Sequence, residues 1–140
     1  MEIKIVTNEQ ELQDAFTVRK IVFIDEQQVP EEEEIDQYDE EATHFVVYQD
    51  QLPIAAGRFR VFEGAGKVER ICVMKDQRKI GAGRFIMTQI EDYAKEQGLS
   101  TIKLNAQTHA IPFYSGLGYE VVSEEFLDAG IPHRAMKKSI

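Results

Sequence analysis

The sequence lacks several features that would place it in a specialised class. It has one cysteine, Cys72, so no disulfide can form within the chain. No apolar run approaches the roughly 18 residues of a membrane-spanning helix. The opening "MEIKIVTNEQ" is too charged for a signal peptide. The net charge of −9 disfavours nonspecific binding to nucleic acid or anionic lipid. We therefore expect a cytoplasmic protein with no nucleic-acid partner and no membrane partner.

The 140 residues, 43% of them hydrophobic, suffice for one ordinary domain with a substantial core over residues 1–140. No repeat or low-complexity linker divides the chain. Antiparallel strands come first and strand–helix–strand units follow, an order that predicts a mixed α/β sheet covered on both faces. The expected strands are "EIKIV", "HFVVYQ", "PIAAGRFRVFE", Lys67 to Met74, "TIKLNA", "YEVVSE" and "HRAMKK".

Three segments are predicted to be helical. Thr7 and Gln10 have the spacing of a capping box, which opens a helix reaching about Phe23. A second helix is indicated by apolar residues at helical spacing, Ile86, Ile90, Tyr93 and Ala94. Gly98 supplies the glycine that commonly ends such a helix. Pro112 fits the first turn of a third, shorter helix.

The stretch "RKIGAGRF", residues 78–85, lies between a strand and the second helix. A helix N-terminus presents unpaired N–H groups and a partial positive charge, so it binds anions such as phosphates. Gly81 and Gly83 have no Cβ to hold a phosphate away, while Arg78, Lys79 and Arg84 add positive charge. The turn is therefore predicted to bind a pyrophosphate.

Two familiar phosphate-binding motifs do not match this turn. A P-loop requires Lys and Ser or Thr after its last glycine, but Gly83 is followed by Arg84 and Phe85. A dinucleotide-binding fingerprint requires a third glycine where Ile86 stands. Both nucleotide hydrolases and dinucleotide enzymes are thereby disfavoured.

The pattern that fits is a basic residue followed by two spaced glycines, here Arg78, Gly81 and Gly83. With "FYSGLGY" at residues 113–119, one helix and one strand downstream, the chain resembles the GNAT superfamily of acetyl-coenzyme A-dependent N-acetyltransferases. "RKIVFIDEQQVP" and "AGIPHRAMKK" are similar to its small bacterial branch of the YjcF and ElaA type. The sequence of this turn differs from that of many family members, in which glycine follows the first basic residue, because Lys79 and Ile80 occupy that stretch here.

The resemblance implies an α/β (α+β) fold with a mixed, largely antiparallel sheet of six to seven strands flanked by helices. It also implies that two central strands, Lys67 to Met74 and Thr101 to Ala106, splay apart. The pantetheine arm of acetyl-CoA would lie between them, with the N–H of Val73 polarising the thioester carbonyl. The cofactor-binding residues implied are Ile71, Cys72, Val73, Arg78, Lys79, Ile80, Gly81, Ala82, Gly83, Arg84 and Asn105. No metal is expected.

Acetyl transfer to a primary amine needs an acid for the departing thiolate and a base for the amine. Tyr114 is the candidate acid, because a phenol stays protonated at neutral pH; a core tyrosine is the alternative. Glu69 is the candidate base, or else a salt-bridged surface acid. His133 and His109 are further candidates, each with a structural alternative. Cys72 is read as a buried, inert thiol rather than a nucleophile.

The acceptor is a small-molecule amine, a protein lysine or an N-terminal amine, and the sequence does not choose among them. Residues 25–41, with ten acids and no base, are either a solvated loop or an attractor for a cationic amine. Arg19, Arg58 and Arg60 favour instead an acceptor that carries an anion. A homodimer is left open, and so is a non-catalytic acyl-CoA-binding module on the same fold.

Overall fold

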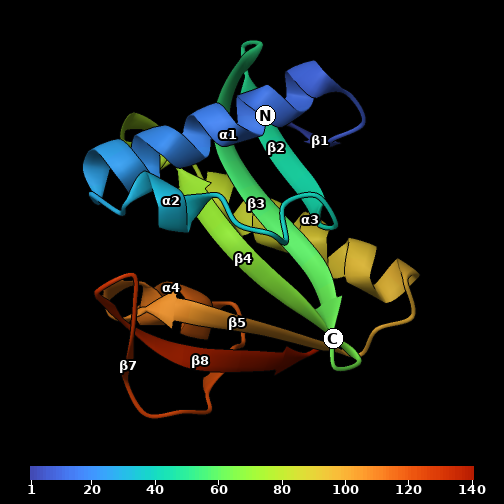
Figure 1. Cartoon of the computed structure of the whole chain (residues 1–140). Coiled ribbons are helices and arrows are strands. Elements are labelled where there is room, and N and C mark those ends of the chain that lie inside the picture. Colours follow the sequence, from blue (N-terminus) through green and yellow to red (C-terminus); the bar gives the residue numbers. More distant parts are fainter.

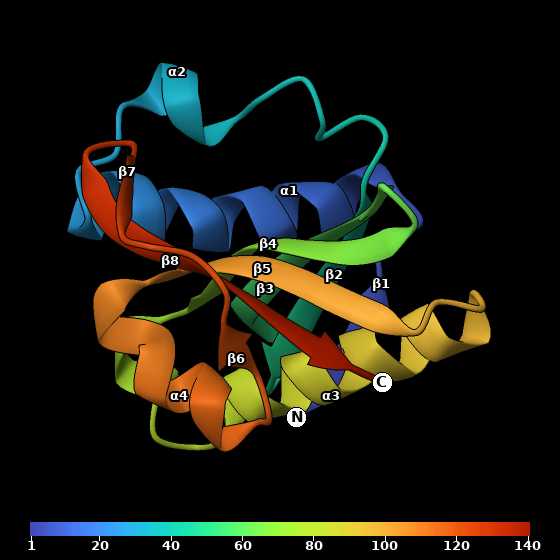
Figure 2. The same cartoon turned by 90° about the horizontal axis from the view of Figure 1, so that it is seen from below.

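The computed structural model describes all residues, 1–140. Figures 1 and 2 show one twisted sheet, with α1 and α2 on one face and α3 and α4 on the other. The strands are β1 (Glu2–Ile5), β2 (Thr43–Gln49), β3 (Leu52–Phe62), β4 (Ala65–Val73), β5 (Thr101–Gln107), β6 (Glu120–Val121), β7 (Phe126–Asp128) and β8 (Ile131–Ser139). The helices are α1 (Glu9–Arg19), the π-helical η1 (Lys20–Glu26), α2 (Glu31–Glu34), the short 3-10 segments η2 (Lys75–Gln77) and η3 (Thr108–Ala110), α3 (Ala82–Glu96) and α4 (Ile111–Gly116).

The strands follow the order β1-β2-β3-β4-β5-β8-β6, and β7 pairs with β8. Only β4 and β5 are parallel; every other pair is antiparallel. The predicted mixed, largely antiparallel sheet is therefore confirmed. It has eight strands rather than six or seven. The extra one, β7, has only three residues, too few to show a period in the sequence.

The predicted start of the first helix is wrong by one residue. Asn8 is the N-cap of α1, and its side chain accepts a hydrogen bond from the N–H of Glu11 at 2.8 Å. The Glu11 carboxylate accepts the N–H of Thr7 at 2.8 Å, so Thr7 precedes the cap. The other helix signals are confirmed: Gly98, at φ 82°, follows α3, and Pro112 lies in the first turn of α4.

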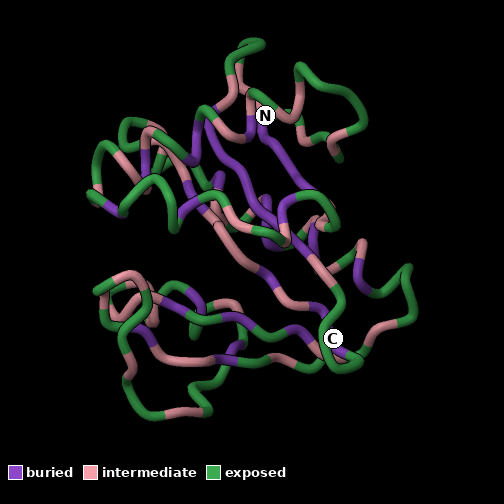
Figure 3. Tube along the Cα trace, viewed as in Figure 1, coloured by how far each residue is buried: buried purple, intermediate pink, exposed green.

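Two apolar layers hold the helices to the sheet (Figure 3). On one face α3 buries Ile86, Met87 and Ile90 completely. On the other face α1 packs against a smaller cluster that includes Val46 and Cys72. Covering both faces keeps the strand ends at the sheet's centre rigid, and the candidate site is built on those ends. No helix combines the length and apolar character needed to cross a membrane.

The predicted splay of the two central strands is confirmed. β4 and β5 pair only at Gly66–Ile102, Lys67–Lys103 and Val68–Leu104, and they diverge beyond these pairs (Figure 1). A bulge follows in β4, where Arg70 and Ile71 both lie opposite Gly57 of β3 and Arg70 has φ 58°. A Cβ on Gly57 would lie 2.6 Å from Ile71 Cδ1, so any larger residue there would require the Ile71 side chain to shift.

Candidate functional site

A cavity of about 850 Å³, called the first cavity below, opens where β4 and β5 separate. Its walls come from β4, the glycine-rich turn, the end of β5 and α4, with further residues from η1, β7 and β8. It brings together most of the predicted site: Glu69, Ile71, Cys72, Val73, Arg78, Lys79, Gly81, Gly83, Arg84, Asn105 and Tyr114. Two predicted residues do not line it. Ile80 is exposed, and Ala82 is buried in the core beside α3.

The glycine-rich turn ends as a helix cap. Gly81 is the N-cap of α3 with φ 85°, a conformation that glycine adopts without strain. The first helical N–H to find a partner is that of Phe85, which donates to the Gly81 carbonyl at 3.0 Å. The N–H groups of residues 82–84 come before it and have no partner within the helix. The turn therefore presents free donors beside the cavity, as an anion site requires.

The positive charge at this turn is smaller than the sequence suggests. Arg78 forms two hydrogen bonds to the Glu26 carboxylate, at 2.8 and 2.7 Å, and Nε donates to the Val73 carbonyl at 2.9 Å. The hydrogen bonds from Arg78 lower the pKa of Glu26. Arg78 thus ties the turn to η1 and β4, and its charge is neutralised. Lys79 and Arg84 line the cavity without an ion pair and supply the free positive charge.

Tyr114, on α4, lines the first cavity. Its ring makes edge contacts with Phe113 and Tyr119, and the residue is 8% exposed. The hydroxyl has no hydrogen-bond partner in the protein. Burial raises the pKa of this phenol, so it stays protonated throughout the physiological range. A hydrogen-bond donor is therefore available to a molecule in the cavity.

Cys72 belongs to the smaller apolar cluster under α1 and is 4% exposed. Burial raises the pKa of its thiol to about 12, and Sγ lies 3.8 Å from the Ala56 carbonyl oxygen. Because the thiolate is the reactive form, this thiol is inert at neutral pH. The geometry favours the interpretation of Cys72 as a packing residue whose backbone lines the cavity.

Glu69 lines the first cavity but is held by cations. Its carboxylate accepts hydrogen bonds from Arg60 at 2.7 Å and from Arg58 at 3.0 Å, and Lys67 Nζ lies 3.7 Å away. Burial alone would raise the pKa of Glu69, but the hydrogen bond from Arg60 and the charge of Arg58 outweigh it and lower the pKa. A carboxylate in this state accepts a proton less readily than an ordinary glutamate.

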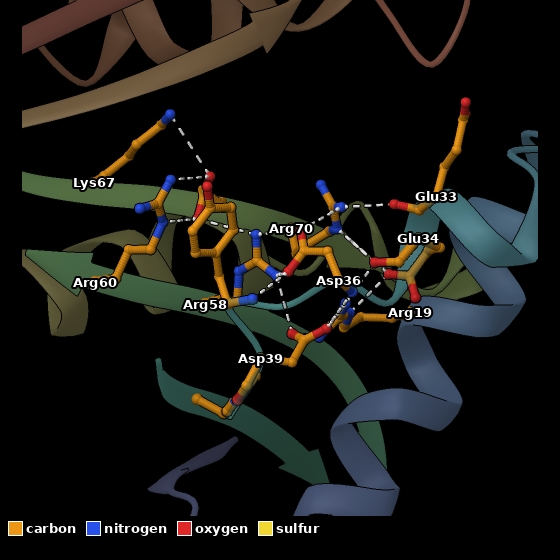
Figure 4. A network of polar contacts seen from close by, with 12 residues as sticks. Arg19, Glu33, Glu34, Asp36, Asp39, Arg58, Arg60, Lys67 and Arg70 are labelled. Atoms are coloured by element: carbon orange, nitrogen blue, oxygen red, sulfur yellow. Dashed lines mark hydrogen bonds and ion pairs between the residues drawn. The ribbon is translucent and has the colours of Figure 1, made fainter. Parts of the chain in front are cut away.

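The acidic segment is not simply a solvated loop, because a buried network of ion pairs holds it to the sheet (Figure 4). Arg19 contacts Glu34 and Asp39, each at 2.7 Å. Arg58 contacts Asp36 at 2.7 Å and Asp39 at 3.0 Å. Arg19 and Arg58 are each 1% exposed.

This network corrects the hypothesis that Arg19, Arg58 and Arg60 bind an anion on the acceptor. The first two are buried and paired with carboxylates, and Arg60 is bound to Glu69. Their role is to fold the acidic segment onto α1 and β3. The exposed acids of the same segment remain free of this network.

The network predicts that acid destabilises the fold. In Asp39 burial opposes ionisation, but the hydrogen bond from Arg19 outweighs it and lowers the pKa; Asp36 and Glu69 have lowered pKa values for similar reasons. Burial also lowers the pKa of His44 below its usual 6.5. Each of these groups binds a proton more readily in the unfolded chain than in the folded one, so the free energy of unfolding falls as the pH falls. Thermal unfolding measured between pH 8 and pH 4 should show that Tm declines below about pH 6.5 and declines more steeply below about pH 4.5. A Tm that stays constant over this range would contradict these ion pairs.

A second cavity of about 360 Å³ adjoins the first. The two share six lining residues: Phe23, Arg70, Gln107, Asp128, Ile131 and His133. The remainder of the second cavity comes from the acidic segment: Val29, Glu32, Glu33, Glu34 and Asp36, with Ala129 from the turn before β8.

The structure separates the two histidine candidates. His109 is exposed and lines only the first cavity. His133 is 8% exposed, lines both cavities and lies opposite Gln107 at the open end of the β5–β8 pair. Its Nδ1 lies 2.7 Å from the Ile131 carbonyl oxygen, and its ring stacks on Phe126.

Several lining residues were not found from the sequence. Glu26 contacts Arg78 from 52 positions earlier, and Gln27 and Gln107, hydrogen-bonded at 2.8 Å, are 80 positions apart. Asp128 reaches the cavities from the short strand β7. Glu26 and Gln27 lie within "RKIVFIDEQQVP", but nothing in the sequence indicates the contacts of these three segments, so only the folded arrangement reveals them.

The fold, together with the glycine-rich turn, the splayed strands and Tyr114 around one cavity, is that of an acetyltransferase family. The family model described as "Acetyltransferase (GNAT) domain" matches residues 8–140, and the chain belongs to this family. Membership confirms the resemblance read from the two motifs and supports an acyltransferase activity.

Relatives and solved structures agree with this assignment. The uncharacterized N-acetyltransferase YjcF of Bacillus subtilis is 53% identical, with 99% of each chain covered. The protein YyaT of the same organism is 43% identical, covering 100% of this chain and 97% of its own. An acyl-CoA N-acyltransferase from Pseudomonas aeruginosa superposes with a TM-score of 0.88 at 25% identity, with 98% of each chain covered. An aminoglycoside 6'-N-acetyltransferase complexed with coenzyme A shares the fold, with a TM-score of 0.79, 14% identity, and 99% and 97% coverage.

Proposed function

We propose that this protein is an N-acetyltransferase that moves an acetyl group from acetyl-CoA to a primary amine by direct attack in a ternary complex. The observation that supports it most strongly is the continuity of the first cavity. One space joins the free N–H groups of α3, the unpaired edges of β4 and β5, and the Tyr114 hydroxyl.

The α3 end of the cavity suits the pyrophosphate of coenzyme A. Free N–H groups, the helix dipole and the unpaired Lys79 and Arg84 all favour an anion there. A Cβ added to Gly83 would meet the Phe113 ring at 3.1 Å, so this wall is close-fitting. The related fold that holds coenzyme A supports the same occupant. Arg78 acts on this site indirectly, by holding the turn through Glu26.

The splayed strands suit the pantetheine arm. The N–H of Met74 donates to the Ile54 carbonyl at 2.8 Å, toward β3. Because successive N–H groups of a strand alternate in direction, the N–H of Val73 faces the opposite edge, where β5 has separated. This N–H can therefore donate to the thioester carbonyl and stabilise the oxyanion that develops on it. Asn105, exposed on β5, lines the opposite wall.

Acetyl-CoA supplies an activated acetyl thioester, and the amine nitrogen forms the new C–N bond as the C–S bond breaks. Starting from a protonated amine, two protons leave the nitrogen and the thiolate gains one, so one proton is released overall. Tyr114 is proposed to donate the proton that the sulfur gains. Glu69, a predicted catalytic residue, faces the same cavity, and its tight ion pairs favour an electrostatic role over proton removal.

The experiment that tests this function mixes the protein with acetyl-CoA and a panel of amines and follows the free thiol of coenzyme A. Thiol release that depends on both an amine and the protein is the expected result. Tight binding of acetyl-CoA without thiol release from any amine would instead identify a non-catalytic acyl-CoA-binding module.

The phosphate site gives a separate prediction. Gly83→Val should weaken CoA binding by more than about tenfold, or about 1.4 kcal/mol, because the branched side chain crowds Phe113 and covers the free N–H groups. Calorimetry on the folded variant measures the change. Gly116→Val is the matched control, since a Cβ there has no neighbour within 4 Å. Equal affinity in the Gly83 variant and the control would remove the phosphate site from the turn.

A further inference from the structure

The second cavity is not used by the proposed binding of acetyl-CoA, yet it opens into the first beside the strand ends. On the basis of the acetyltransferase function proposed above, we propose that the second cavity is the acceptor site and that it binds a small primary amine bearing a second ammonium group. In this proposal His133 Nε2 accepts the proton of the reacting amine.

The charge of the second cavity selects a cation. The carboxylates that line it are either paired with arginines or unpaired. Glu34 and Asp36 are already paired with arginines. Glu32 and Glu33 are exposed and form no ion pair, and neither does Asp128.

Arg70 is the only arginine or lysine that lines the second cavity, and its charge is already balanced. Its guanidinium donates to the Glu33 and Glu34 carbonyls, each at 3.1 Å, and to Asp36 at 3.2 Å. The unpaired carboxylates therefore leave the cavity net negative. An ammonium group is attracted to such a wall, and a carboxylate or phosphate is repelled.

His133 provides an independent observation at the junction of the two cavities. It is more than nine-tenths buried, and a carbonyl oxygen can only accept, so Nδ1 carries the proton and donates to Ile131 at 2.7 Å. In the neutral ring Nε2 is then left with a lone pair, and it has no partner in the protein. The charged and titratable residues that line the two cavities with it are Glu26, Glu32, Glu33, Glu34, Asp36, Lys67, Glu69, Arg70, Cys72, Arg78, Lys79, Arg84, His109, Tyr114 and Asp128.

The position of His133 suits proton removal better than that of Glu69. Glu69 lines only the first cavity, and its carboxylate is bound to two arginines. His133 touches both spaces, so an amine that extends from the second cavity toward the thioester passes it. An alkyl ammonium with a pKa of about 10 is nearly all protonated at pH 7 and needs such a base. The unpaired acids hold the distal ammonium while His133 deprotonates the proximal one.

The first test compares two probes, cadaverine and n-pentylamine, which differ only in the second amine. Cadaverine should have the larger kcat/KM by about tenfold or more. In the Glu33→Gln/Asp128→Asn variant this preference should shrink, whereas Glu31→Gln, an exposed acid outside the cavity, should keep it. Equal kcat/KM for the two amines would overturn the acceptor site while leaving the acetyltransferase function intact. Absence of transfer to every amine in the panel, with CoA bound, would count against the function itself.

The second test is the pH profile of His133→Gln. Its kcat should be about 10²-fold lower, with CoA affinity unchanged. Wild-type kcat should level off well below the amine pKa of about 10, while that of the variant keeps rising toward it. The same plateau in both proteins would refute His133 as the base. If the variant proves unstable, the cadaverine preference in the Glu33/Asp128 variant still tests the site.

Discussion

Tyr114→Phe is expected to lower kcat by about 10²-fold while leaving CoA affinity nearly unchanged. The phenol lines the first cavity with no partner in the protein, and burial keeps it protonated. Phenylalanine preserves the edge contacts with Phe113 and Tyr119 but removes the proton that the departing sulfur needs. The measurements are turnover at saturating acetyl-CoA and calorimetry with CoA.

Tyr119→Phe is the matched control for this change. Tyr119 is also buried, packs against Tyr114 and donates to Glu91 at 2.8 Å, but it does not line the cavity. Losing its hydroxyl should cost about 1 kcal/mol of stability and leave kcat unchanged. Equal turnover in wild type and Tyr114→Phe would make Tyr114 a packing residue and leave the thiolate without its proposed acid.

Arg19→Met is expected to lower the free energy of unfolding by about 3–5 kcal/mol. The substitution keeps an apolar stem of similar length but leaves Glu34 and Asp39 buried without their cation. An unpaired charge in such a position costs more than the ion pair contributed. Because these carboxylates belong to the acidic segment, the wall of the second cavity should loosen as well. Urea unfolding measures the first effect, and the cadaverine preference measures the second.

The exposed pair of Lys4 and Glu2, 3.5 Å apart, is the contrast for this prediction. Lys4→Met should change stability by less than about 1 kcal/mol, because solvent screens exposed ion pairs. A loss of similar size in both variants would show that burial does not determine the strength of the Arg19 network.

The elements around the first cavity could be predicted because their signals are local in the sequence. Gly81 and Gly83 mark a helix start by their backbone requirements, and "FYSGLGY" places Tyr114 one helix and one strand later. The spacing between these motifs fixes which strands flank the cavity. The structure agrees at each of these points, down to the splay after Val68 and Leu104.

The acceptor half could be predicted only in part. The sequence offers His133 as a candidate base and residues 25–41 as an attractor for a cationic amine, but it does not show how these residues meet in the fold. Ten acids among the 17 residues 25–41 are typical of a solvated segment, and nothing in the sequence indicates that Arg19 and Arg58 pair with the buried Asp39 from α1 and β3. His133 lies within "AGIPHRAMKK", but its free Nε2 depends on the Ile131 carbonyl two residues earlier, which the sequence does not indicate. Ion pairs between distant segments and the tautomer of a histidine are properties of the packed chain.

Direct transfer of an acetyl group from acetyl-CoA to an amine can be tested by mass spectrometry of the protein and the products. With acetyl-CoA alone, the intact mass of the protein should stay unchanged, because the only thiol, Cys72, is buried and protonated. After cadaverine is added, acetylated cadaverine and free CoA should form in equal amounts. An acetylated protein that passes its group to the amine, or bound acetyl-CoA that never acetylates any amine, would contradict the account.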